Sequence, residues 1–88
     1  MGEPTPGEIE HDTLAILKRV GRPGMEPSRS SELLADLEFD SIQVIELVAE
    51  LEDHFNVSIP LNELPRIKTV GDMTDTLSRL MQEARSTG

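Results

Sequence analysis

The sequence predicts an all-α fold, a bundle of three main helices and one short helix with a long loop after the first helix. Three segments carry apolar residues at helical spacing, and each follows a residue that commonly caps helices. The only aromatic residues are Phe39 and Phe55, too few for the alternating pattern of a β-sandwich. The 88 residues suffice for one domain, spanning 1–88, with a core over about 8–84 and flexible termini.

The first helix is expected to begin near Thr5, where Thr5 and Glu8 have capping-box spacing and Pro6 occupies the first helical position. An apolar face then continues to Val20. Residues 21–31 are rich in glycine, proline and serine, which predicts a loop. Three leucines after this segment are expected to tuck beneath the bundle: Leu33, Leu34 and Leu37.

The second helix is predicted over residues 41–55. Asp40 is a favourable N-cap and Gln43 follows at the capping-box distance, while Asn56 is suited to a left-handed C-terminal position. Projected as a helix, the segment shows an apolar stripe within about 100° that we assign to the core. The stripe consists of Val44, Leu47, Val48, Leu51 and Phe55.

The last third of the chain predicts a connector and two helices. Pro60 disfavours helix in the residue before it, so the preceding segment is expected to be extended. Apolar residues at three-residue spacing predict a short helix over 61–67, limited by its internal proline. Thr69 is expected to cap the last helix, with Asp72 in its first turn, and the polar tail from Arg85 is expected to fray.

The composition excludes several classes of partner. The formal net charge is −9, from 17 acidic residues against 8 Lys plus Arg, so nucleic acids and anionic membranes would be repelled. A protein with a basic patch is the natural partner, although acidity also promotes solubility alone. No cysteine is present and no apolar run approaches the roughly 20 residues that span a bilayer, which together suit a cytoplasmic protein.

A second apolar group lies on the helix 41–55, on a face about 130° from the core stripe. Acidic residues flank it, and residues 30–65 contain nine acids but no Lys or Arg. We predict a docking face for a basic partner; the alternative is that the first loop folds over it. The docking face comprises Ile42, Ile45 and Ala49 with Glu46, Glu52 and Asp53.

Ser41 is the candidate for modification, because it occupies the first helical position directly after the cap. A phosphodiester on its hydroxyl would lie at the positive end of the helix dipole. No catalytic constellation is evident. The acidic alternation before Ser41 fails as a calcium loop because Leu47 stands where the bidentate Glu is required. His11 and His54 lack ligand spacing, so no metal site is expected.

The segment 36–42, Asp-Leu-Glu-Phe-Asp-Ser-Ile, followed by Leu-Glu-Asp-His-Phe at 51–55, resembles the signature of the acyl carrier protein family. The segments 57–60 and 69–72 also resemble the family at matching spacing. The resemblance implies a non-catalytic carrier that receives 4′-phosphopantetheine from coenzyme A on Ser41 through a phosphopantetheinyl transferase. We also expect the protein to be a monomer. Such proteins shuttle thioester-linked acyl intermediates between enzymes of fatty-acid, polyketide or related biosynthesis.

The same resemblance implies roles for other residues. Asp40 would join the docking face in contacting the acyl-loading and acyl-processing enzymes through their basic patches. Apolar residues between the last three helices would line a cleft for the acyl chain: Val48, Leu51, Ile59, Leu64, Ile67 and Met73.

Departures from the family pattern point to a specialised pathway. Glu38 stands where the family usually has glycine, which predicts strain if the backbone φ there is positive. Gln43 and His54 replace common acids, and Pro65 is unusual in the short helix. Aminoacyl or peptidyl carriers usually show Gly-Gly-x-Ser, so the motif disfavours that variant. The alternative from another class is an unmodified acidic helical domain that binds a basic protein.

Overall fold

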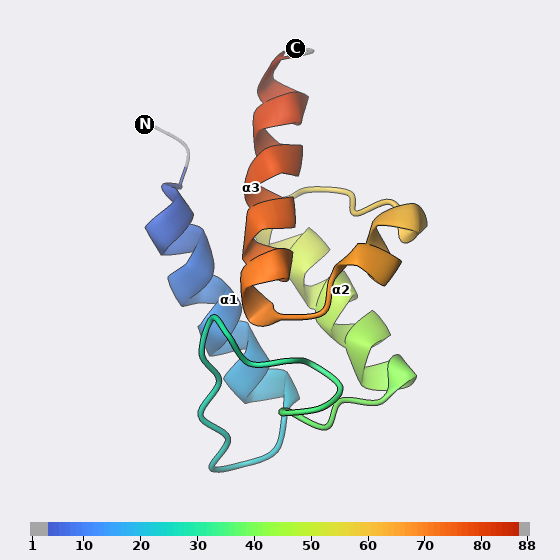
Figure 1. The fold of residues 1–88 in the computed structure, drawn as a ribbon. Helices are drawn as coiled ribbons and strands as arrows, with labels where there is room; N and C mark the ends of the chain where they lie inside the picture. The colour runs from blue at the N-terminus through green and yellow to red at the C-terminus, as the bar shows by residue number, and fades with distance from the viewer. Residues whose placement is uncertain (1–3, 87–88) are drawn as a thin grey trace.

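The computed structural model describes residues 4–86 and shows the predicted helices: α1 (Pro6–Val20), α2 (Ser41–Phe55), the short 3-10 helix η1 (Leu61–Arg66) and α3 (Val70–Ser86). Helix α1 packs against both α2 and α3. The long loop after α1 runs across the end of the bundle where α2 and α3 begin, as Figure 1 shows. Within residues 4–86 the only β pairing is one isolated bridge, between Glu32 and Thr69.

Reciprocal side-chain caps fix the starts of α1 and α2. The Glu8 N–H donates to Thr5 Oγ1 at 3.2 Å, and the Thr5 N–H donates to Glu8 Oε1 at 2.8 Å. Before α2, the Gln43 N–H donates to Asp40 Oδ1 at 2.8 Å and the Asp40 N–H to Gln43 Oε1 at 3.1 Å. Asn56 ends α2 with φ of 54°, so both predicted boundaries of this helix are confirmed.

The core forms from the apolar stripes of the three long helices. In α2, Leu47, Val48 and Leu51 are buried, and the two outer members of the predicted stripe pack against the core from its edge. The sequence did not predict two buried threonines. Thr13 and Thr74 are buried because each hydroxyl donates to a helical carbonyl four residues earlier, at 2.7 and 3.0 Å.

The long loop is held by the segment that precedes α3. The Leu33 N–H donates to the Lys68 carbonyl at 2.9 Å, and the Val70 N–H donates to the Ser31 carbonyl at 3.0 Å. Leu33 and Leu37 are buried as predicted, but Leu34 is 65% exposed, so its predicted place beneath the bundle is wrong. Leu33 points into the core, and the adjacent Leu34 side chain therefore faces solvent.

Arg29 joins this loop to two helices. Its guanidinium donates to both Asp75 oxygens, at 3.0 and 2.9 Å, and to Glu10 Oε1 at 3.3 Å. The two carboxylates raise the pKa of Arg29, and the hydrogen bonds with Asp75 are the largest cause. The loop is therefore fixed on α1 and α3 by both main-chain and side-chain contacts.

Helix α3 extends further than the sequence predicted. Its backbone stays helical through Ser86, whereas fraying was expected from Arg85. The termini predicted to be flexible flank the core at about 8–84, and of these the residues 1–3 and 87–88 lie outside the described residues.

Thr69 caps α3, as predicted, and Asp72 in the first turn completes the cap, which the sequence did not predict. Its Oδ2 accepts the N–H groups of Lys68 at 3.0 Å and Thr69 at 3.1 Å, and its own N–H donates to Thr69 Oγ1 at 3.0 Å. These hydrogen bonds favour the ionised carboxylate and lower the pKa of Asp72, with the Lys68 N–H as the largest cause.

We expect Asp72→Asn to lower the free energy of unfolding by about 1 kcal/mol at pH 7. A carboxylate with a depressed folded pKa stabilises the fold above its ordinary pKa of about 3.9 and loses this contribution as the pH falls through the folded value. In urea unfolding, the difference in the free energy of unfolding between Asp72→Asn and wild type should therefore shrink below about pH 4. Glu26→Gln serves as the control, because Glu26 is exposed and should leave the pH profile unchanged. A difference that stays constant down to about pH 2.5 would contradict this account.

Candidate functional site

Ser41 is the first residue of α2, and its side chain is exposed. Within the described part of the chain its hydroxyl makes no hydrogen bond. The cap occupies the N–H groups of Asp40 and Gln43, which leaves those of Ser41 and Ile42 without an internal partner. A phosphate on Ser41 would therefore meet two free N–H donors at the positive end of the helix dipole, so the residues present fit a phosphodiester.

The apolar part of the predicted docking face is open to solvent. Ile42 is 68% exposed, Ile45 is 61% exposed, and Ala49 is also exposed. The long loop is held at the start of α3 instead, so the alternative in which it covers these side chains is wrong. The structure thus places three apolar side chains of α2 together on one uncovered face.

The acidic residues of the docking face differ in their contacts. Glu46 and Asp53 are exposed and make no ion pair or hydrogen bond within residues 4–86. Asp40 is engaged by the Gln43 N–H, and Glu52 Oε2 accepts the Ile59 N–H at 2.7 Å. This last contact could not be predicted from the sequence, because it joins α2 to a connector seven residues away. Glu46 and Asp53 are thus the carboxylates free to meet a partner's cations.

The six predicted cleft residues gather in the core. Leu51 and Met73 are fully buried, Val48 and Ile59 are nearly so, and Leu64 and Ile67 pack against them from the edge. Five surface cavities lie elsewhere, and none of these five is lined by any of the six residues. The cleft therefore stays a prediction.

Known proteins match the chain over most of its length. Residues 12–77 match a family described as "Phosphopantetheine attachment site". A Caulobacter vibrioides protein named "Probable acyl carrier protein" is 35% identical over 71 residues, which are 81% of this chain and 81% of that protein. The chain belongs to the acyl carrier protein family. Members of this family are non-catalytic carriers that use covalently attached 4′-phosphopantetheine and interact with the enzymes that modify and process them.

Two further proteins are similar to the carrier protein, one in its solved structure and one in its sequence. A solved holo acyl carrier protein from Geobacter metallireducens has a TM-score of 0.77 with this chain at 21% identity, covering 91% of this chain and 93% of its own. This likeness confirms the predicted four-helix bundle. A "Meromycolate extension acyl carrier protein" from Mycobacterium leprae is 33% identical over 63 residues, which are 68% of this chain and 55% of that protein.

Glu38 stands where the resemblance to the family predicts glycine, and its backbone conformation in the structure is unusual. Glu38 has φ of 57°, the left-handed conformation that favours glycine, so the strain expected from the sequence is present. Its Oε1 lies 3.4 Å from Arg22 Nη1, and both side chains are largely exposed.

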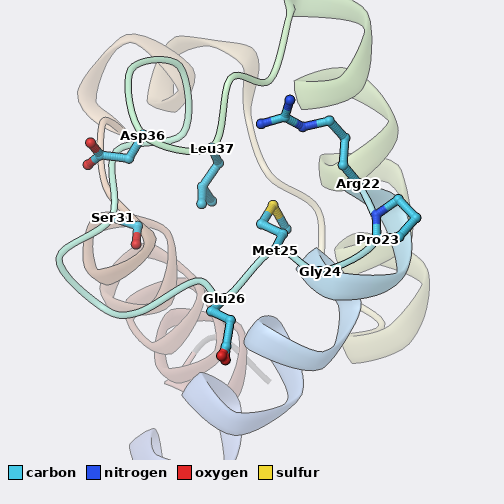
Figure 2. Close-up of a pocket in the computed structure, with 8 residues that line it drawn as sticks. All are labelled: Arg22, Pro23, Gly24, Met25, Glu26, Ser31, Asp36 and Leu37. Carbon is cyan, nitrogen blue, oxygen red and sulfur yellow. The ribbon is translucent and has the colours of Figure 1, made fainter.

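Arg22 also lines a cavity of about 430 Å³ beneath the long loop. Figure 2 shows Met25 and Leu37 pointing into this cavity, with Arg22 on one side and Ser31 and Asp36 on the other. The sequence predicted no site here. Both positive and negative side chains line the cavity, so its charge does not indicate a particular ligand.

Both histidines of the carrier protein contact one carboxylate. His54 Nε2 lies 3.2 Å from Asp12 Oδ2, and His11 Nδ1 lies 3.4 Å from Asp12 Oδ1. The hydrogen bond with His54 is the largest cause of the lowered pKa of Asp12, with smaller contributions from His11. Among the residues that the structure describes, no group of three His, Asp or Glu has a metal-binding arrangement. Within residues 4–86, none of the helices combines the length and the apolar character that a membrane span requires.

We expect Glu38→Gly to raise the free energy of unfolding by about 1 kcal/mol, because glycine adopts a positive φ without the clash of a Cβ atom. Glu38→Ala is the matched control, since it removes the same carboxylate but keeps the strain. Urea unfolding of both variants checks this prediction. Equal stability of the two variants would show that the left-handed backbone at residue 38 costs nothing.

Proposed function

We propose that this acyl carrier protein bears 4′-phosphopantetheine on Ser41 and shuttles thioester-linked acyl intermediates between enzymes of fatty-acid, polyketide or related biosynthesis. The observation that carries the proposal is the exposed Ser41 hydroxyl, without an internal partner, beside two free N–H groups at the start of α2. When attached, the group supplies a thiol, which the chain itself lacks because it contains no cysteine.

The role of Ser41 is to supply the oxygen of the phosphodiester. The adjacent Asp40 carboxylate is engaged by the Gln43 N–H, and no side chain of the described residues hydrogen-bonds the Ser41 hydroxyl. We therefore assign the base that removes the Ser41 proton to the phosphopantetheinyl transferase, in keeping with a carrier that is not itself an enzyme.

The docking face is the proposed contact with this transferase and with acyl-loading and acyl-processing enzymes. Ile42, Ile45 and Ala49 offer exposed apolar area, and Glu46 and Asp53 offer free carboxylates beside it. This combination fits an enzyme surface with an apolar centre and a basic rim. A monomeric carrier, a cytoplasmic location and the absence of nucleic-acid or membrane partners stay predictions from the sequence.

We further propose a specialised rather than a housekeeping pathway. The departures at Glu38, Gln43, His54 and Pro65 support this proposal. The similarity to a protein named for meromycolate extension is in keeping with it, although the chain spans 55% of that protein. The acyl chain would be sheltered by the six cleft residues once they move apart.

The modification of Ser41 can be tested by intact mass. With coenzyme A, magnesium and a phosphopantetheinyl transferase, we expect the purified protein to gain one phosphopantetheinyl group and Ser41→Ala to gain none. Ser58→Ala is the control, because Ser58 is also an exposed serine and should still be loaded. If folded, unmodified wild-type protein gains no mass with several transferases, the unmodified acidic interaction domain becomes the better account.

Replacing an apolar residue of the docking face should slow loading without unfolding the protein. We expect Ile45→Ser to lower kcat/KM for loading about tenfold, because Ile45 would be buried only in the complex. Leu34→Ser is the matched control, since Leu34 is 65% exposed but lies on the long loop. Equal loading of both variants would place the docking surface elsewhere.

A further inference from the structure

Arg29 lies where the long loop meets α1 and α3. Its guanidinium donates to both Asp75 oxygens on α3, at 3.0 and 2.9 Å, and to Glu10 Oε1 on α1 at 3.3 Å. We propose that Arg29 is a positioning residue for Ser41, because it fastens the loop to the start of α3 and so holds the segment that leads to Asp40 and Ser41. This inference rests on the proposed function.

Gly71 provides the space that Arg29 occupies on α3. The Gly71 N–H donates to the Arg29 carbonyl at 2.8 Å, so the backbone of the loop contacts the first turn of α3 here. A Cβ atom on residue 71 would lie 2.9 Å from Arg29 Cγ and 3.2 Å from both Nε and Cζ, closer than side-chain atoms normally approach. Any larger residue at position 71 would therefore push Arg29 away from α3.

Main-chain hydrogen bonds connect this contact with the start of α2. The Leu33 N–H donates to the Lys68 carbonyl, and the Phe39 N–H donates to the Leu33 carbonyl, both at 2.9 Å. Leu33 and Phe39 are also buried. Phe39 is followed directly by the cap residue Asp40. A shift of the loop on α3 would thus pass along this short path to the residue before Ser41.

The loop depends on such individual contacts for its position. Between α1 and α2 the chain forms turns and one isolated bridge but no helix or strand. Losing the guanidinium of Arg29 would remove three hydrogen bonds that hold this segment on α1 and α3. A segment held by few contacts opens locally, and fewer contacts make the opening more frequent. Without Arg29, we therefore expect the path to the start of α2 to open more often.

Amide hydrogen exchange of the unmodified full chain measures this opening. We expect Arg29→Gln to speed exchange of the Leu33 and Phe39 N–H groups by about two- to fivefold, the size of one or two exposed ion pairs. Their rates should not depend on low concentrations of urea, which indicates a local opening. Arg29→Lys should restore part of the protection, because an ammonium keeps the charge but not the planar fork that binds both oxygens of a carboxylate.

Arg79→Gln is the matched control for charge and for overall stability. Arg79 pairs with Glu63 at 2.7 Å and with Glu83 at 3.3 Å, away from the long loop. Its replacement makes the same change in net charge and also removes contacts with two carboxylates. Exchange at Phe39 should nevertheless match wild type in this variant, because the local opening does not involve Arg79.

Gly71→Ala displaces Arg29 without changing the net charge. Alanine is a better helix former than glycine, which stabilises α3 relative to the unfolded chain but not relative to the locally open state. The free energy of unfolding in urea should therefore fall less than in Arg29→Gln, while exchange at Phe39 speeds up to a similar extent. A substitution that only destabilises the whole fold would not separate these two measurements.

Loading by a phosphopantetheinyl transferase tests the consequence for Ser41. The docking face lies outside the path, so the transferase should still bind the variants but find Ser41 correctly placed for only part of the time. We expect Arg29→Gln and Gly71→Ala to lower kcat by up to about fivefold and to leave KM nearly unchanged. Partial unfolding of the whole chain would instead raise KM and leave kcat unchanged, because unfolded protein does not dock.

The outcomes separate this inference from the proposed function. If exchange at Phe39 in Arg29→Gln matches wild type, or rises equally in Arg79→Gln, Arg29 does not hold the path and the inference is wrong. If wild type is loaded and kcat is the same in Arg29→Gln, Arg29 fixes the loop without positioning Ser41, and the inference is wrong as well. If wild type is not loaded at all, the proposed function fails, and the role of Arg29 toward Ser41 fails with it even where exchange responds as expected.

Discussion

The reciprocal cap between Asp40 and Gln43 is the constraint on which the site depends. It sets the residue at which α2 begins, and from there each side chain lies about 100° round the helix from the one before it. The start of α2 therefore places Ser41 at the end of the helix, Leu47 and Leu51 in the core, and Ile45 in solvent. The cap thus lies beside the proposed modification site, on the same helix as the buried leucines and the proposed docking face.

The same cap determines what remains available at the end of the helix. Four N–H groups of a helix start lack helical partners, and a side-chain cap normally satisfies some of them. Here the cap leaves the N–H groups of Ser41 and Ile42 free, directly beside the hydroxyl of interest. A helix start in which every N–H group had an internal acceptor would leave no free N–H donor to bind a phosphate.

Local features of the fold could be predicted from the sequence because neighbouring residues determine them. Capping boxes, the left-handed Asn56 and the exposure of Ile42 and Ile45 follow from spacing along one helix. The strained backbone at Glu38 could be anticipated only through the family's glycine.

Contacts between distant segments could not be predicted in this way. The bond from the Ile59 N–H to Glu52 and the contacts of both histidines with Asp12 depend on how the helices pack. Leu34 was misplaced because the turn around it is fixed by hydrogen bonds to residues near 68–70. Whether a cleft opens is likewise a property of side-chain packing, which the order of apolar residues does not determine.

The distribution of charge along the chain has a consequence for how the carrier meets an enzyme. All of its lysines and arginines lie outside residues 30–65, so the segment that contains α2 is purely anionic while the cations sit on the rest of the molecule. This separation gives the protein an electric dipole moment. The field of a basic enzyme surface would exert a torque on this dipole and turn α2 toward that surface before contact, which shortens the rotational search. If the protein shuttles between several enzymes as we propose, this orientation would act at every encounter.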